Sequence, residues 1–301
     1  MRSTMRDVPL TITSILRHGT TQHGDSEVVT ATESGLRRLR YARLGARATK
    51  LANGLRRLGV RGDERVATFG WNNQEHLEAY LAVPAMGAVL HPLDIQLTPE
   101  QVGSISGHAE DRIVIVDASL AEGFAKLLPE LTTVHTVLVT GTGDAPALDG
   151  LGKQVIPYER VLAEEPEDFA WPDIDERSAA VMCYPTVYSH RASWLHALTV
   201  CSGNAAGVRV DDRLLPIVPM SRYSAWGLPY AALMSGADLV LPDRFLRPEP
   251  LLRLVEEARP TVCGVEPTVW NEVMSYLDDH PERDLSSVRL TVTGTIEAEM
   301  S

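Results

Sequence analysis

The stretch "SAAVMCYPTVYSHRASWLHAL", residues 178–198, joins a strand pattern to the beginning of a helix. Residues 179–184 form a short apolar run, typical of a strand that is covered on both faces. Ser189 is a favourable helix N-cap, and the following pattern continues through Leu198. Since only residues 185–188 separate the two patterns, we expect an unusually tight strand-to-helix connection here.

Strand and helix patterns alternate along the rest of the chain. Leu44, Ala48, Leu51 and Leu55 recur at helical spacing and form one apolar face. Another helix is expected to begin at Thr98, where a following proline and glutamine complete a capping box. This alternation predicts an α/β fold with mainly parallel sheets covered by helices.

The fold is expected to divide into two α/β subdomains. Acidic residues and prolines interrupt the periodicity over residues 163–178, so we predict one subdomain over 1–172 and a second over 173–301. The sequence ends soon after the strand pattern at 288–294, which would leave part of a sheet uncovered. We therefore expect a homo-oligomer formed through this truncated face, with a tail that folds back as the alternative.

Composition excludes several classes of function. The chain has 301 residues, of which 44% are hydrophobic and 23% charged, and its net charge of −12 argues against nucleic acid as a partner. We recognise no apolar segment of membrane-spanning length and no signal peptide, so we expect no membrane association and a cytoplasmic location. The three cysteines lack zinc-site spacing, and no metal is expected.

Several segments, in order, resemble the N-terminal part of the acyl-CoA synthetases of the adenylate-forming superfamily, particularly the medium- and long-chain fatty acid ligases. They are residues 79–111, 175–184, 187–198, 215–220, 225–246 and 259–271. The resemblance implies an adenylation lobe whose two subdomains meet at an acyl-binding crevice.

The opening stretch departs from that family. In the ligases, the corresponding strand is followed by a Ser/Thr/Gly-rich phosphate loop that ends in Pro-Lys-Gly. Here Tyr184 continues through Pro185 directly to Tyr188, without a glycine or lysine. A phosphate cradle needs several inward-pointing backbone N–H groups, and proline has none. We therefore expect that this chain does not bind ATP and uses no cofactor.

Further departures affect the gate and the end of the sequence. The ligases carry a His-aromatic gate where this chain has Ser-Arg-Tyr-Ser at 221–224. Their adenine-contacting turn is replaced here by Thr-Ile-Glu at 295–297. Their ribose-binding Asp and their C-terminal domain with its catalytic Lys have no counterpart in this sequence.

Glu266 and Arg222 are the principal candidate catalytic residues. Glu266 ends a strand where the ligases usually have a small apolar residue, so its carboxylate is expected to be desolvated and suited to proton transfer. Arg222 lies in the gate and would pair with Glu266 or hold a substrate carboxylate. The alternative for Glu266 is a solvated or helix-capping carboxylate, and the alternative for Arg222 is a salt bridge without chemical function.

His190 is the third catalytic candidate. At a helix N-terminus it is expected to be neutral and to face the crevice. The alternative is a structural histidine that is hydrogen-bonded to the backbone. The candidate substrate-binding residues share positions at strand ends or in the gate. They are Tyr223, Tyr188, Tyr184, Trp226 and Asp94, the last of which is also a plausible turn or cap residue.

These observations lead to three hypotheses. The first is an ATP-independent enzyme that performs cyclisation, condensation or dehydration on a small acyl, carboxylate or carbonyl metabolite. The second is a non-catalytic acyl-binding or scaffold protein. The third is a residual ATP-dependent acyl-CoA ligase, if the loop is missing only from the sequence in hand.

Overall fold

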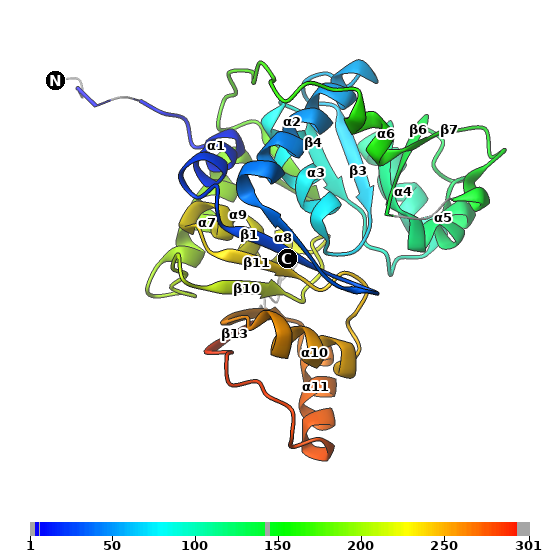
Figure 1. Cartoon of the computed structure of the whole chain (residues 1–301). Coiled ribbons are helices and arrows are strands. Elements are labelled where there is room, and N and C mark those ends of the chain that lie inside the picture. Colours follow the sequence, from blue (N-terminus) through cyan, green and yellow to red (C-terminus); the bar gives the residue numbers. More distant parts are fainter. Residues whose placement is uncertain (1–3, 6, 142–144, 294–301) are drawn as a thin grey trace, which may run out of the picture.

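The computed structural model describes residues 4–5, 7–141 and 145–293, which form two sheets (Figure 1). The strands of the seven-stranded sheet are, in spatial order, β7 (Gln154–Pro157), β6 (Thr136–Thr140), β5 (Ile113–Asp117), β3 (Arg65–Phe69), β4 (Val89–Pro92), β8 (Ala179–Cys183) and β9 (Thr186–Ser189). All neighbours are parallel except β8 and β9.

The six-stranded sheet is also mainly parallel. Its order is β13 (Leu290–Thr293), β12 (Val262–Val265), β10 (Arg213–Pro216), β11 (Asp238–Leu241), β1 (Glu27–Thr32) and β2 (Gly35–Arg40). Only the β1–β2 hairpin is antiparallel. The predicted α/β class with mainly parallel sheets is therefore confirmed.

Helices cover the sheets in layers. The helices are α1 (Ile12–Gln22), α2 (Tyr41–Arg57), α3 (Gln74–Ala85), α4 (Pro99–Ala109), α5 (Ala121–Leu127), α6 (Tyr158–Ala163), α7 (His190–Cys201), α8 (Tyr223–Trp226), α9 (Leu228–Ser235), α10 (Pro248–Ala258) and α11 (Pro267–Asp279). Buried residues of α1, α2, α3 and α9 form one core with residues of both sheets, whereas α4 and α5 cover the far face of the seven-stranded sheet. Helices α10 and α11 cover the far face of the other sheet, at the bottom of Figure 1.

The predicted helix features are present. Leu44, Ala48, Leu51 and Leu55 are fully buried on one face of α2. Thr98 and Gln101 form the capping box of α4. Local sequence therefore specified these elements correctly.

The predicted division at 172/173 does not separate the sheets. Strands β8 and β9 come from the second segment but complete the seven-stranded sheet, and β1 and β2 come from the first segment but join the six-stranded sheet. The two subdomain ranges stay a prediction, and the strand exchange was not foreseen because pairing between distant segments leaves no mark on local periodicity.

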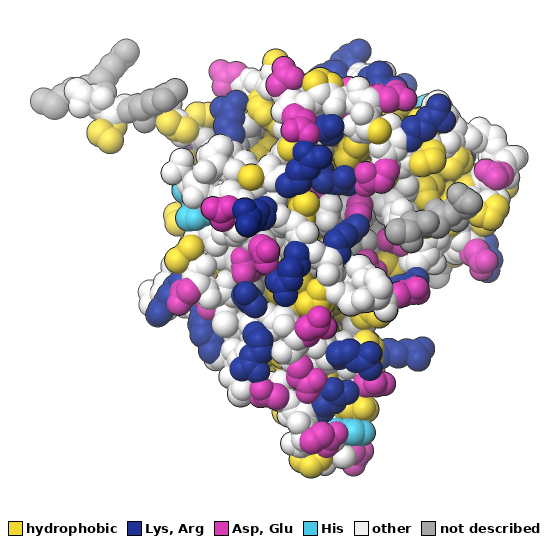
Figure 2. Space-filling view, viewed as in Figure 1, with side chains coloured by type: hydrophobic (Ala, Val, Ile, Leu, Met, Phe, Trp, Pro, Cys, Tyr) yellow, Lys and Arg dark blue, Asp and Glu magenta, His cyan; other side chains and the backbone are white. Residues whose placement is uncertain are grey.

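The surface carries both signs of charge. Figure 2 shows basic and acidic side chains interspersed over the visible face. Within the described ranges, no helix combines the length and the apolar character that crossing a bilayer requires.

Candidate functional site

The predicted tight strand-to-helix connection is instead a hairpin. Cys183 of β8 lies opposite Thr186 of β9, so the turn consists of Tyr184 and Pro185, which are joined by a cis peptide bond. Helix α7 begins only after β9, where the Ser189 hydroxyl accepts a hydrogen bond from the backbone N–H of Ala192 at 3.1 Å. The two-residue turn has a single backbone N–H, that of Tyr184, whereas a phosphate cradle uses several.

Arg222 connects the ends of the two sheets beside this turn. Its Nε donates to Asp94 Oδ2 at 2.9 Å, its Nη1 to Glu266 Oε1 at 2.9 Å and its Nη2 to Gln96 Oε1 at 3.0 Å. Asp94 follows β4 of the seven-stranded sheet, and Glu266 follows β12 of the six-stranded sheet. Burial lowers the pKa of Arg222, but hydrogen bonds and charge attraction from the two carboxylates more than offset it, and the net shift is upward.

The predicted pairing of Glu266 with Arg222 is therefore present, and Asp94 joins the pair. Glu266 was expected to lie in an apolar, desolvated setting. Its side chain is instead 18% exposed and forms an ion pair with the Arg222 guanidinium. This geometry is also that of the alternative interpretation, a salt bridge without chemical function. Catalytic roles for these residues stay a prediction.

A cavity of about 310 Å³ opens next to Arg222, which we call the Arg222 cavity. Tyr184, Asp94 and Ser221 line it together with apolar residues that include Ile105. It lies beyond the carboxyl ends of β4 and β8, where ligands of parallel α/β sheets commonly bind. Tertiary structure thus brings together Asp94, Tyr184 and Arg222 from three separate segments.

His190 does not belong to this group. It is fully buried, and its Nδ1 accepts a hydrogen bond from the backbone N–H of Ile12 at 3.2 Å. Burial lowers the pKa of His190 to about 4, so the side chain is neutral, as expected. The expectation that it faces the crevice was wrong: it holds the first turn of α1, which matches the structural alternative.

The remaining predicted residues lie around the cavity or in the core. Tyr188 is half-buried on β9, and Trp226 is half-buried at the end of α8; both pack against the core between the sheets. Tyr223 begins α8, but its side chain lies outside the described part of the structure. Among the described side chains, neither Tyr188 nor Trp226 lines the Arg222 cavity.

Sequence reasoning missed a buried histidine in the wall of the same cavity. His91 Nδ1 lies 2.8 and 3.0 Å from the two carboxylate oxygens of Asp111, and both residues are fully buried. Among the described residues, His91 Nε2 has no hydrogen-bond partner. The sequence feature that could have identified His91 is its position inside the otherwise apolar run "AVLHPL", residues 88–93.

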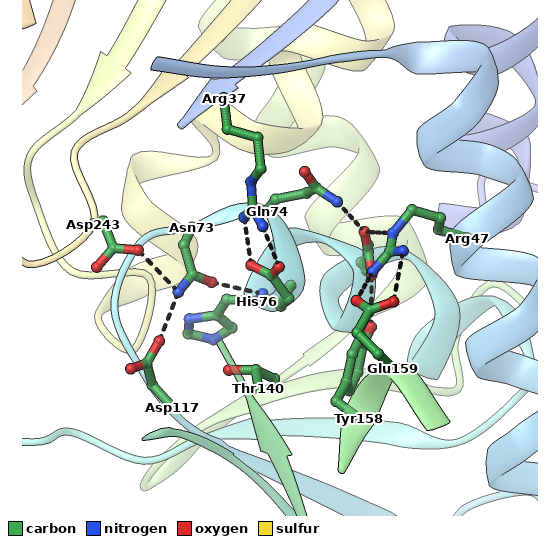
Figure 3. A network of polar contacts seen from close by, with 12 residues as sticks. Arg37, Arg47, Asn73, Gln74, His76, Asp117, Thr140, Tyr158, Glu159 and Asp243 are labelled. Atoms are coloured by element: carbon green, nitrogen blue, oxygen red, sulfur yellow. Dashed lines mark hydrogen bonds and ion pairs between the residues drawn. The ribbon is translucent and has the colours of Figure 1, made fainter. Parts of the chain in front are cut away.

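A second polar network lies where the β1–β2 hairpin meets the N-terminus of α3 (Figure 3). Arg37 makes a two-pronged contact with Glu75, at 2.7 and 2.8 Å. Nearby, Arg47 and Tyr158 both bind the fully buried Glu78. Burial raises the pKa of Glu78 despite the adjacent Arg47.

The same network contains two carboxylates that share one amide. Asn73 Nδ2 donates to Asp117 Oδ2 at 2.9 Å and to Asp243 Oδ2 at 3.3 Å (Figure 3). Burial and the negative charge of Asp117 raise the pKa of Asp243 to about 6. A cavity of about 720 Å³ adjoins these groups, but the described residues contain no set of three or more ligands able to hold a metal ion.

Curated relatives of this chain are acyl-CoA ligases by name. The long-chain-fatty-acid–CoA ligase of Thermus thermophilus is 38% identical over 303 residues, which cover 97% of this chain and 54% of the relative. The 3-methylmercaptopropionyl-CoA ligase of Ruegeria pomeroyi is 35% identical over 280 residues, which cover 89% of this chain and 51% of the relative. The chain thus spans about half the length of the curated relatives it matches.

Solved structures have the same fold. The N-terminal domain of FACL13 from Mycobacterium tuberculosis superposes with a TM-score of 0.77 at 21% identity, covering 95% of this chain and 70% of that chain. The anthranilate CoA ligase AuaEII in complex with anthranoyl-AMP has a TM-score of 0.82 at 18% identity, covering 98% of this chain and 57% of that chain. The model of the family described as AMP-binding enzyme matches residues 16–300. The chain therefore belongs to the AMP-binding enzyme family, which contains the acyl-CoA ligases it resembles.

Proposed function

We propose that this chain is an acyl-binding lobe that holds a small acyl ligand in the Arg222 cavity without activating it through ATP. The observation that carries the proposal is the position of the cavity beside the β8–β9 turn. Tyr184 and Pro185 line the cavity and leave one backbone N–H in the turn. Triphosphate binding requires several such donors and a cation, so the cavity suits an acyl group better than a nucleotide.

The polarity of the cavity supports an acyl ligand. Apolar side chains such as Leu93, Leu97 and Ile105 form part of the wall, and Arg222 and Ser221 supply hydrogen-bonding groups. Ligand sites typically combine a mostly apolar lining with a few polar groups that orient the ligand.

ATP-dependent acyl-CoA ligation is the second candidate. It is favoured by relatives named as CoA ligases that are 35% and 38% identical over most of this chain. The acid–base reactions predicted from Glu266 have weaker support, since no relative reported above is named for such chemistry and the carboxylate is held in an ion pair.

Two measurements on the purified chain separate these functions. Isothermal titration calorimetry with hexanoate and with methyl hexanoate tests acyl binding, and ATP–pyrophosphate exchange in the presence of hexanoate tests activation. We expect binding of at least one acyl probe and no exchange, with the Thermus ligase as the positive control. Exchange stimulated by hexanoate would establish the second candidate, and absence of binding of both acyl probes would remove the first.

A further inference from the structure

We propose that the outer edge of β9, together with the exposed side of α7, binds a second copy of this chain. The two β9 strands pair antiparallel across a twofold axis. We call this region the β9–α7 surface, and its exposed apolar side chains are Tyr184, Val187, Leu195 and Leu198. The inference does not depend on acyl binding, and it concerns a different sheet edge from that of β13.

Exposed apolar side chains are concentrated on the β9–α7 surface. Among the described residues, nine large hydrophobic side chains are exposed, and four of them belong to residues 184–198, with exposed fractions of 40–49%. Helix α7 begins directly after Ser189, and at a rise of 1.5 Å per residue Leu195 lies about 9 Å further along the helix. The four side chains therefore fit within one interface of ordinary size, which buries about 800 Å² on each partner.

The edge of β9 supplies backbone groups for strand pairing. In the described part of the chain, β9 is the last strand of the seven-stranded sheet and pairs with β8 on one side only. Thr186 and Val187 are both exposed. Alternate residues of an antiparallel strand direct their N–H and C=O groups away from the neighbouring strand, so another strand can be added here. For identical chains, a twofold arrangement in which β9 pairs with β9 satisfies both edges at once.

The distribution of charge favours a second copy as the partner. The chain has a net charge of −12, so two copies repel each other overall. Residues 177–210, which include β9 and α7, contain no Asp or Glu, although the chain has 40 acidic residues. Glu176, the acid directly before this range, forms an ion pair with Arg191 of α7. Two acidic copies therefore approach each other with least repulsion through this surface.

The same composition argues against an anionic partner. The range 177–210 contains three arginines and no lysine, and one of the three, Arg191, is paired with Glu176. Surfaces that bind anionic lipids typically present about four to eight basic residues. An apolar surface with little net charge instead suits an identical apolar surface.

Sedimentation velocity of the purified chain over a range of concentrations tests the inference. We expect a monomer–dimer equilibrium, and Val187→Lys should raise the dimer dissociation constant at least about tenfold, because the ammonium would be buried in the interface without a partner. The control Met274→Lys changes a similarly exposed apolar residue of α11 and should leave the dissociation constant unchanged. A wild-type chain that stays monomeric, or a dimer that Val187→Lys does not weaken, would overturn the proposal.

Cross-linking identifies the paired strand directly. The variant Val187→Cys places a thiol at the paired edge, and a short bismaleimide should convert it to a covalent dimer. The control Met274→Cys and the wild type should give only background, since Cys183 and Cys263 are buried and Cys201 is half-buried. Dimerisation in solution without a Val187→Cys cross-link above this background would place the interface elsewhere and contradict the proposal.

The contribution of α7 has a separate test. The double variant Leu195→Lys/Leu198→Lys changes two exposed side chains, so it should fold as the wild type does. We expect it to weaken the dimer at least about tenfold. An unchanged dissociation constant would overturn the part of the proposal that concerns α7, whereas the cross-link at residue 187 tests β9 independently.

Discussion

Arg222 bridges Asp94 and Glu266, two carboxylates that follow strands of different sheets. Its replacement by alanine leaves the carboxylates of Asp94 and Glu266, whose side chains are 16% and 18% exposed, without their cation. We expect Arg222→Ala to lower the free energy of unfolding by about 1–2 kcal/mol, as measured by urea denaturation.

An exposed arginine on α10 provides the control for this substitution. Arg253 pairs with Glu249 one helical turn away, and the two side chains are 66% and 53% exposed. Arg253→Ala should change the free energy of unfolding by about 0.5 kcal/mol or less, because exposed pairs contribute little. Equal effects of the two variants would mean that the Arg222 pairs are no more than surface contacts.

Asp243 makes stability depend on pH. Its folded-state pKa of about 6 exceeds the ordinary value of 3.8, because burial and Asp117 oppose its ionisation. Between these values the folded chain binds a proton that the unfolded chain has lost. Stability therefore falls as pH rises from about 4 to about 6, and the loss persists above that range.

Asp243→Asn should remove this pH-dependent loss. Asp243 has a φ of 52°, a left-handed conformation that asparagine also tolerates. We expect the variant to be more stable than the wild type by about 1–3 kcal/mol at pH 7.5 and by little at pH 4, as measured by urea denaturation at both values. The control Asp25→Asn changes a carboxylate that is 95% exposed and should reproduce the wild-type pH profile. If the stability of Asp243→Asn also followed the wild-type pH profile, the assignment of this pH dependence to Asp243 would be wrong.

At the scale of elements, the start of α4 can be tested directly. The Thr98 hydroxyl accepts from the Gln101 backbone N–H at 3.4 Å, and Gln101 Oε1 accepts from the Thr98 backbone N–H at 3.0 Å. Thr98→Ala should lower the free energy of unfolding by about 1 kcal/mol, whereas Thr98→Ser keeps the hydroxyl and should cost less than half of that. Similar losses for both variants, by thermal or urea denaturation, would show that the cap does not stabilise the helix.

Elements were predictable where their signals are local. The buried face of α2 and the cap of α4 follow from spacing and from residue type within one segment. Strand β9 was missed because Thr186 to Ser189 form only four residues after a two-residue turn, too few for a clear alternation. Its pairing with β8 is what turns an expected connection into a hairpin.

At the scale of the whole molecule, self-association stays a prediction. Strand β13 pairs with β12 on one side and is at the edge of the six-stranded sheet in the described part of the chain, while residues 294–301, on which the expectation also depended, lie outside it. An open strand edge favours pairing with another chain. Sedimentation velocity should detect a dimer, and a clean monomer at all concentrations tested would contradict the prediction.

The amino-acid sequence by itself determined the α/β class, the helix faces and caps, the family resemblance and the lack of glycine and lysine after β8, since each is set by neighbouring residues. It also identified Arg222, Glu266 and Asp94 as candidates. Only the tertiary structure decided that Arg222 binds both carboxylates, that His190 supports α1, and that His91 and Asp111 form a buried pair in the cavity wall. These contacts join residues far apart in the chain, because adjacent positions in a parallel sheet come from distant segments.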